Sequence, residues 1–204
     1  MNSIVDNFQE MKNLLRFSGN DNLFLVWLVK RPKDGNTTSH GNNRTRTIKS
    51  YYFQSLAQLE EKKEEIVSIC DTFNCRAYIC LNPRSLSKIL FSIQDTVMDK
   101  IKDDSGKVKM DLNGLIDRAF MKAQYDGERY WVIDVDDDEP TYLAELTEVI
   151  NRARSEFETN VIATLPTVHG YHLITHRFDT RSLDHWTADI KKDALTILYA
   201  NINV

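Results

Sequence analysis

Apolar residues recur every three to four positions in several stretches of the chain, which is the spacing of one face of an α-helix. The clearest stretch follows Pro140, because proline is favoured at the first position of a helix. Ser55 stands directly before another such stretch. The stretches predicted as helices cover residues 4–17, 56–70, 87–102, 112–123, 142–157 and 184–192.

Shorter apolar or alternating runs between these stretches have the length of β-strands. In the run 74–82, alternation places Arg76 and Tyr78 on one face, which would point into a cleft if the strand lines one. The runs predicted as strands cover residues 23–29, 51–53, 74–82, 132–136, 160–165, 171–178 and 195–199.

Residues 30–49 are polar and contain turn-forming residues, so they are predicted to form a long loop. Six cations in it would suit contact with phosphates, although a solvated hairpin tip explains them equally well. These cations are Lys30, Arg31, Lys33, Arg44, Arg46 and Lys49.

The order of the predicted elements indicates an α+β protein of two closely packed modules. Residues 1–127 alternate strands and helices and form an N-terminal α/β module. Residues 128–204 follow the order strand, helix, strand, strand, helix, strand, which is the βαββαβ pattern of ferredoxin-like and RRM-like folds. The first and third strands of that fold are neighbours, so the end of the strand 132–136 is expected near the strand 171–178 and near His172.

A concentration of acids ends the apolar strand at 132–136. Asp134 and Asp136 lie two positions apart, so strand alternation places both carboxylates on one face. Two carboxylates side by side repel each other unless a cation lies between them, which makes this pair a candidate divalent-metal site. The acids at 137–139 precede the helix that Pro140 opens, where negative charge is favourable without any metal.

Composition is that of an ordinary globular protein, with 42% hydrophobic and 27% charged residues and a formal net charge of −4. The net charge does not indicate a nucleic-acid-binding protein, but it is compatible with a local basic groove. The three cysteines lack zinc spacing and favour reduced thiols in the cytoplasm, and no apolar run reaches the roughly 20 residues that span a membrane.

Two motifs resemble those of the archaeo-eukaryotic primase superfamily, which includes the primase-polymerases. Trp131-Val-Ile-Asp134-Val-Asp136 resembles the family's strand of hydrophobic residues interrupted by two aspartates, and Thr167-Val-His-Gly170-Tyr-His172 resembles its second motif, a Ser-x-His in a hairpin strand. Gly170 stands where the family usually has Ser. The resemblance implies an RRM-like palm preceded by an α/β module, on which Asp134 and Asp136 bind Mg²⁺ or Mn²⁺ and His172 contacts the phosphates of an incoming nucleotide.

The family has a third acidic motif, and this sequence offers three candidates for it. Asp193 is preferred because it shortly precedes a Leu-Thr pair, and Asp179 and Asp189 are the alternatives. Nucleotidyl transfer uses carboxylates to hold ions that activate the attacking 3′-oxygen and neutralise the pyrophosphate leaving group.

The resemblance also implies the partners of the protein. These are nucleoside triphosphates, a DNA or RNA template and a replicative helicase, in the replication or repair of a phage, plasmid or related mobile element. Arg76, Arg177 and Thr167 are expected to contribute to substrate binding, although Arg76 is also compatible with a merely solvated or paired side chain.

Two other functions use the same residues. A metal-dependent nuclease would use the same carboxylates with water as the nucleophile. A catalytically degenerate primase-like module would only bind nucleic acid. A lone Asp-x-Asp pattern occurs in many loops, so the spacing alone does not choose among the three.

Overall fold

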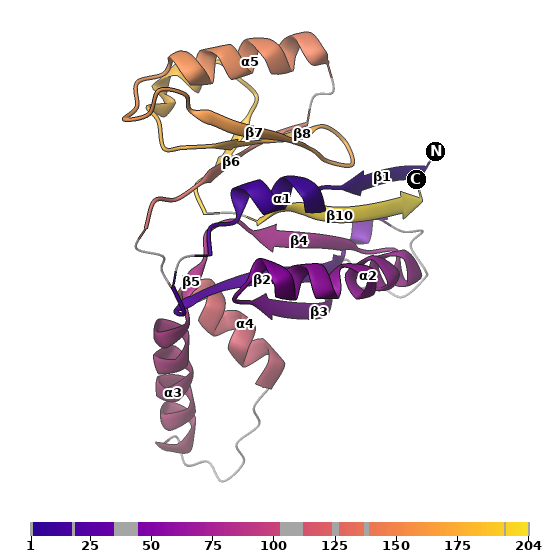
Figure 1. Cartoon of the computed structure of the whole chain (residues 1–204), viewed down its shortest axis with the longest axis vertical. Coiled ribbons are helices and arrows are strands. Elements are labelled where there is room, and N and C mark those ends of the chain that lie inside the picture. Colours follow the sequence, from indigo (N-terminus) through magenta and orange to yellow (C-terminus); the bar gives the residue numbers. More distant parts are fainter. Residues whose placement is uncertain are drawn as a thin grey trace.

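Two antiparallel sheets form the frame of the protein, and helices pack against both of them (Figure 1). The computed structural model describes residues 2–17, 19–34, 45–102, 112–123, 127–136, 139–193 and 195–203. The chain is therefore an α+β protein, as its sequence predicts. Among the described residues, no helix is long and apolar enough to cross a membrane.

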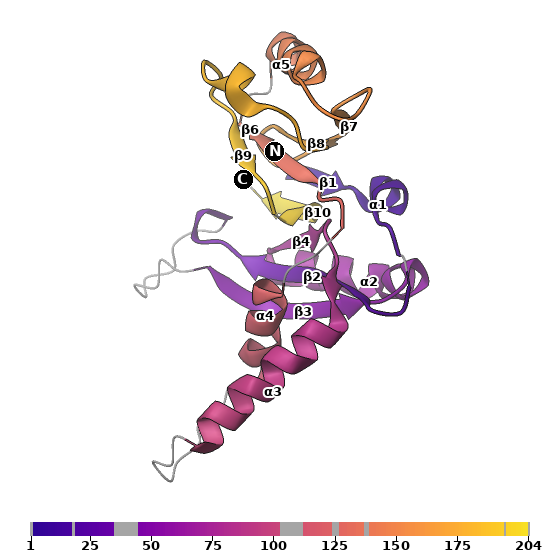
Figure 2. The same cartoon turned by 90° about the vertical axis from the view of Figure 1, so that its left-hand side faces the viewer.

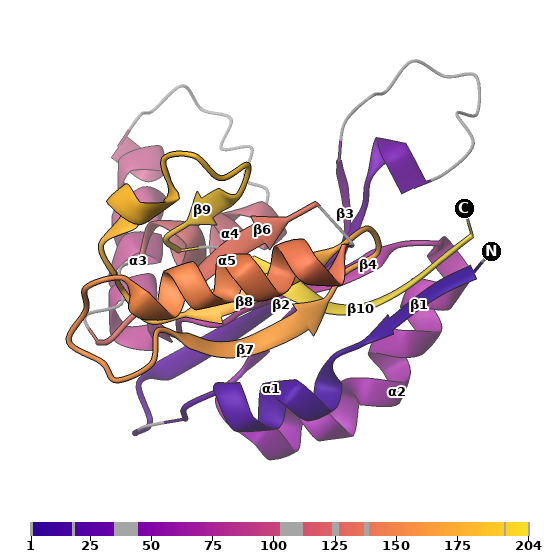
Figure 3. The ribbon, with the colours of Figure 1, turned by 90° about the horizontal axis from the view of Figure 1, so that it is seen from above.

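The first sheet joins the two ends of the chain. Its strand order is β1-β10-β4-β2-β3, with the short β5 paired to β2. Pairing of β1 with β10 brings the N- and C-termini side by side (Figures 1 and 3). The strands are β1 Asn2–Asp6, β2 Asn22–Lys30, β3 Arg46–Phe53, β4 Arg76–Cys80, β5 Arg84–Ser85 and β10 Leu195–Asn203.

The second sheet has the strand order β7-β8-β6-β9, and all of its pairings are antiparallel. As predicted, the strand that carries Asp134 lies beside the strand that carries His172. The helix α5 (Pro140–Arg152) covers the outer face of this sheet, with Pro140 in its first turn (Figures 1 and 3). The strands are β6 Trp131–Val135, β7 Val161–Pro166, β8 Tyr171–Thr175 and β9 Asp189–Lys191.

Four helices cover the first sheet in two layers (Figure 2). On one face, α1 (Phe8–Leu14) and α2 (Leu56–Phe73) share a core with the inner face of the second sheet. On the other face, α3 (Leu86–Lys102) and α4 (Leu112–Lys122) pack on β2 and β4. The side chain of Ser55 caps α2 by accepting a hydrogen bond from the amide of Gln58.

A buried asparagine ties the start of β6 to the first sheet. Asn82, which follows β4, donates from its side-chain amide to the carbonyl of Tyr130 at 2.9 Å and accepts from the amide of Tyr130 at 2.8 Å. The side-chain amide of Asn82 thus makes the two hydrogen bonds that a neighbouring strand would make to the backbone of Tyr130, which lies between the two sheets. The two sheets are held in a fixed relation at this crossing.

Two predicted helices were wrong in part or in whole. The first helix begins only at Phe8, because residues 2–6 are extended and pair with β10, a strand nearly two hundred residues away in sequence. The stretch 184–192 is not a helix: a 3-10 turn, η2 (Thr180–Leu183), precedes it and its end forms β9, which pairs with β6. In both places long-range pairing outweighs local periodicity.

The ends of other elements also differ from prediction. The last strand lies in the first sheet, where it pairs with β4 and β1, although it belongs in sequence to the segment 128–204. The predicted loop 30–49 is shorter, because β2 extends to Lys30, the 3-10 turn η1 occupies Pro32–Asp34, and β3 begins at Arg46. Residues 35–44 of that loop lie outside the described residues.

Candidate functional site

The odd- and even-numbered side chains of β6 lie on opposite faces of the second sheet. Ile133 and Val135 pack against α5, whereas Val132 packs into the core shared with the first sheet. By alternation, Asp134 faces the first sheet with Val132. Asp136 follows the end of β6 and is exposed. The carboxylate of Asp134 is therefore held at the boundary between the two sheets.

His172 is the direct cross-strand partner of Asp134. Its Nε2 lies 3.2 Å from Oδ1 of Asp134, and its Nδ1 lies 2.8 Å from the hydroxyl of Thr196 on β10. An ionised carboxylate can only accept, so Nε2 carries the proton that it donates to Asp134. Side chains from β6, β8 and β10 thus form a polar chain that runs from the second sheet to the first.

Lys191 on β9 neutralises the second oxygen of Asp134. Its ammonium group donates a hydrogen bond to Oδ2 of Asp134 and lies 3.6 Å from Oδ2 of Asp189. Asp189 also pairs with Asp134 in the β6–β9 register. Two carboxylates on adjacent strands therefore flank one cation, and in this structure the cation is an ammonium.

These contacts change the acidity of the groups involved. The hydrogen bond from His172 contributes most to holding the pKa of Asp134 well below its usual range, and Lys191 adds to the effect, while partial burial opposes it. Burial acts to lower the pKa of Lys191, but the hydrogen bond to Asp134 and the charges of Asp134 and Asp189 together raise it overall. Asp134 is thus a fixed negative charge at neutral pH.

Arg31 brings a further cation to the same place from the first sheet. Its Nη1 donates to the hydroxyl of Tyr78 on β4 at 3.3 Å. Burial acts to lower the pKa of Arg31, but the hydrogen bond to Tyr78 and the charges of Asp34 and Asp134 raise it overall. The charge of Asp134 is thus one of several that act on Arg31.

Two of the residues predicted from the sequence have internal partners. Arg76 is buried, and its Nε and Nη2 both donate to the carboxylate of Asp34 in a bidentate pair, so of the two alternatives to substrate binding, solvated or paired, the paired one holds. Asp193 accepts from Arg84 at 2.9 Å and from Asn82 at 3.2 Å, at the crossing between the sheets. The cross-strand register makes Asp189 better placed than Asp193 to act with Asp134.

The remaining predicted residues lie along the β7–β8 hairpin. Thr167 closes its turn: its amide donates to the carbonyl of Gly170 at 2.8 Å and its hydroxyl accepts from the amide of His169. Arg177 is exposed, two residues beyond the end of β8. The roles of Thr167 and Arg177 in substrate binding stay predictions.

Gly170 is where the hairpin touches β6. Its φ is +147°, and a Cβ there would lie 2.1 Å from the carbonyl oxygen of Val135 and 3.3 Å from Cα of Asp136. A serine cannot occupy this position unless the backbone between Asp134 and Asp136 moves. The departure from the primase motif is therefore a requirement of this hairpin.

The donor set fits an ion that is shared with phosphates. Among the described residues, no group of three or more acidic, histidine or cysteine side chains is arranged to hold a metal ion. Mg²⁺ is commonly bound by only one or two carboxylates together with substrate phosphates and water. Asp134 and Asp189, which already flank a cation, meet that requirement, and Asp136 is exposed beside them.

Comparison with known proteins returned no match to a family model, to a curated protein or to a solved structure.

Sequence reasoning missed Lys191 and Thr196. The spacing Asp189-x-Lys191 could have revealed Lys191, because residues two positions apart in a strand lie on the same face. The prediction of a helix over 184–192 concealed it. Thr196 could not be found locally, because its contact with His172 depends on β10 crossing to the other sheet.

Substituting Gly170 should destabilise the protein and disturb the site. For Gly170→Ala we expect the free energy of unfolding to fall by about 1–3 kcal/mol, because the methyl group collides with the Val135 carbonyl at a strained φ. Gly19→Ala is the matched control, since Gly19 also has a positive φ of +74° but no atom within 4 Å of the added Cβ. Denaturant unfolding of both variants measures the difference, and equal losses would contradict the close contact.

Asp134 should make stability depend on pH in the acid range. Its pKa is lower in the folded than in the unfolded chain, so its stabilisation is complete above the ordinary aspartate pKa of about 4 and is lost as the pH falls below it. At pH 6 we expect the free energy of unfolding of the wild type to exceed that of Asp134→Asn by about 1–3 kcal/mol, which is the range for hydrogen bonds to charged groups. Denaturant titrations from pH 6 to pH 3 should show this margin shrinking.

Asp95→Asn, an exposed substitution on α3, should show no such margin. A margin for Asp134→Asn that is constant over the acid range would contradict the bonded, ionised carboxylate.

Proposed function

We propose that the protein is a metal-dependent nucleotidyltransferase of the primase-polymerase type, with its site at the boundary between the two sheets. One observation carries the proposal: Asp134 and Asp189 flank a cation directly beside His172, on the face that turns towards the first sheet. This arrangement unites anionic ligands for an ion with cationic groups for phosphates. Nucleotidyl transfer needs both within a few ångströms.

The strand order of the second sheet supports the same proposal. Counting from β6, the order β7-β8-β6-β9 is second, third, first, fourth, which is the arrangement of a βαββαβ palm. The turn η2 stands where such a palm has its second helix. β10 follows this sheet in sequence and pairs with β4 of the first sheet. An α/β module before an RRM-like palm is the organisation that the sequence resemblance implies.

The residues have separate tasks in this proposal. A divalent ion would supply charge neutralisation of the triphosphate and would lower the pKa of an attacking hydroxyl group. Asp134 and Asp189 would hold it. Lys191 would turn from Asp134 to a phosphate oxygen, because its long side chain reaches both. His172 is fixed by Thr196 and keeps an N–H directed at Asp134. Arg31, which is bonded to Tyr78, feels the charge of Asp134.

A second candidate is a module that binds nucleotides or nucleic acid without catalysis. The bond between Lys191 and Asp134 favours it, because an ammonium group already satisfies the carboxylate. In the first candidate a metal ion replaces the Lys191 ammonium group at Asp134, whereas in the second Lys191 stays bonded to Asp134. They are therefore separated by variants of Lys191 and Asp134.

Replacing Asp134 should abolish catalysis. Templated primer extension with Mn²⁺ and nucleoside triphosphates should be about 100-fold slower or worse in Asp134→Asn, because a preorganised charge that stabilises the transition state is lost. Asp95→Asn on α3 removes the same charge at an exposed position and should retain full activity. A wild type that binds Mn²⁺ and triphosphate but extends no primer would select the second candidate.

Replacing Lys191 should affect metal and triphosphate in opposite directions. In Lys191→Ala, Mn²⁺ should bind more tightly because Oδ2 of Asp134 has lost its competing ammonium, and triphosphate should bind about 10- to 100-fold more weakly because a charge-assisted bond is gone. Lys192→Ala is the matched control: this neighbour lies over the ring of Trp131 and carries the same charge. Isothermal titration calorimetry measures both ligands. A parallel change in the two affinities would contradict the exchange of partners.

A further inference from the structure

The C-terminus of α2 brings two of the three cysteines together. The amide of Cys75 donates to the carbonyl of Cys70 at 3.1 Å, and Asn74 has a left-handed conformation with a φ of +47°. This is the hydrogen bond of a Schellman motif, which turns the chain back onto the last turn of the helix. Cys75 therefore lies beside Cys70 at the point where α2 ends and β4 begins.

The two thiols are in contact inside one core. Both side chains are buried in the cluster that the two sheets share. The thiol of Cys70 donates a hydrogen bond to the sulfur of Cys75, and the Cys75 thiol is directed to the carbonyl of Ile69 at 3.9 Å. Sulfur atoms that share a hydrogen bond need only a short movement to form a disulfide.

This contact makes the two thiols chemically unequal. The hydrogen bond from Cys70 contributes most to holding the pKa of Cys75 below its ordinary value, and the charge of Lys30 adds to the effect, while burial and the charge of Asp34 oppose it. The same hydrogen bond and burial raise the pKa of Cys70 above its usual range. Because the thiolate is the reactive form of cysteine, Cys75 is the thiol that reacts first.

The last turn of α2 covers the pair and controls access to it. Residues 71–73, which separate the two cysteines from solvent along the chain, are exposed. The ammonium group of Lys30 donates to the carbonyl of Phe73 at 3.1 Å, and the side-chain amide of Asn74 donates to the carbonyl of Asp34 at 2.7 Å. Opening of this one turn admits a small reagent without unfolding of the sheet.

We propose that Cys70 and Cys75 are a reversible dithiol–disulfide pair that hydrogen peroxide oxidises, with Cys75 as the attacking thiol and Cys70 as the resolving thiol. This modification site is independent of the proposed function. Its disulfide would fasten the end of α2 to the start of β4. Intracellular disulfides of this kind are typically transient and redox-sensing.

The reaction proceeds in two balanced steps. The Cys75 thiolate attacks one oxygen of the peroxide and the O–O bond breaks, which leaves a sulfenic acid and a hydroxide that takes up the thiol proton to form water. The Cys70 sulfur then attacks the sulfenic sulfur, the S–O bond breaks, and the hydroxide leaves as water with the Cys70 proton. Two thiols are oxidised to one disulfide while one peroxide is reduced to two waters.

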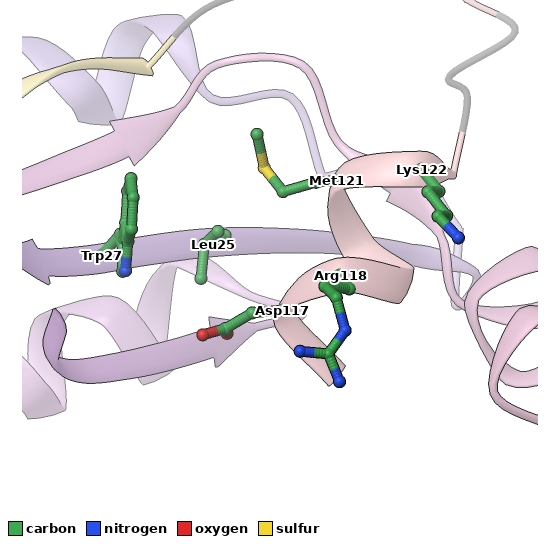
Figure 4. Close-up of a pocket in the computed structure, with 6 residues that line it drawn as sticks. All are labelled: Leu25, Trp27, Asp117, Arg118, Met121 and Lys122. Atoms are coloured by element: carbon green, nitrogen blue, oxygen red, sulfur yellow. The ribbon is translucent and has the colours of Figure 1, made fainter. Parts of the chain in front are cut away.

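Cys80 is the internal control. Its thiol donates to the carbonyl of Asn82 at 3.0 Å rather than to a sulfur, and burial raises the pKa of Cys80 to about 11. It lies in another core cluster together with Leu25, which also lines a recess of about 280 Å³ between β2 and α4 (Figure 4). If access alone decided oxidation, Cys80 would react at least as readily as the pair.

Peptide mapping of the folded wild type tests the proposal. The protein is treated with hydrogen peroxide, its remaining thiols are alkylated in denaturant, and it is digested with trypsin. Cleavage after Lys63, Arg76 and Arg84 releases the pair in the peptide 64–76 and Cys80 in the peptide 77–84. We expect the peptide 64–76 to be lighter by two hydrogens and free of alkylation, and the peptide 77–84 to be alkylated. Dithiothreitol before alkylation should restore both thiols of the pair.

Three other results of the mapping would overturn the proposal. These are an unchanged peptide 64–76, a peptide in which the cysteines carry sulfinic acid without a bridge, and preferential oxidation of Cys80. A disulfide between two molecules would contradict it as well.

Single substitutions test the roles of the two thiols. Cys70→Ser keeps a hydrogen-bond donor beside Cys75 but removes the resolving sulfur, so a sulfenic acid should accumulate on Cys75 and be trapped by dimedone. Cys75→Ser should give no dimedone adduct on Cys70, and Cys80→Ser should leave formation of the bridge unchanged. Circular dichroism shows whether each variant is folded, and the wild-type mapping does not depend on them. Equal trapping in Cys70→Ser and Cys75→Ser would overturn the assignment of Cys75 as the attacking thiol.

Discussion

The pairing of β6 with β8 in a single register is the constraint on which the rest of the structure depends. It sets Asp134 opposite His172 and, by alternation, sends Ile133 into the α5 core and Val132 into the core shared by both sheets. A slip of one residue would drive Asp134 into the apolar layer beneath α5, where an unpaired carboxylate is very unfavourable. The charge that serves the proposed function therefore also fixes the register.

The same constraint explains why the site lies between the sheets. Asp134 is only partly exposed, so its carboxylate is stable only with hydrogen-bonding partners. One partner lies on each neighbouring strand: His172 on β8 and Lys191 on β9. His172 is then held by Thr196 from the first sheet. Lys191 has a long, flexible side chain and can exchange one anion for another, whereas His172 is fixed at both nitrogens. A fixed donor and a movable cation beside one carboxylate suit a substrate that carries both metal and phosphate.

Much of the framework follows from local pattern. The strand that carries Asp134 and the helix that Pro140 opens can be predicted, because each depends on residues close in sequence, and the order of the elements predicts the neighbouring strand with His172. The structure differs where distant strands pair. Residues 2–6 extend along β10, residues 189–191 extend along β6, and β10 itself crosses to the first sheet. Periodicity contains no information about such partners.

The candidate site shows the same division. Asp134 and His172 are predictable because a motif and a strand order point to them, but Lys191 and Thr196 depend on β9 and β10, whose partners are not evident in the sequence. Arg76 has the chemistry of a phosphate ligand, yet its contact with Asp34 is visible only in three dimensions. Gly170, a departure from the motif, is explained by one backbone contact with Val135.

A crystal soaked with Mn²⁺ and a non-hydrolysable nucleoside triphosphate provides the most direct measurement, because the anomalous signal of manganese locates the ion without reference to the protein. We expect an ion bound to Asp134 and Asp189, with the Lys191 ammonium turned from Asp134 to the triphosphate and His172 still bonded to Thr196. An ion bound elsewhere, or a triphosphate bound while Lys191 stays on Asp134, would contradict the assignment of this boundary as a metal and nucleotide site.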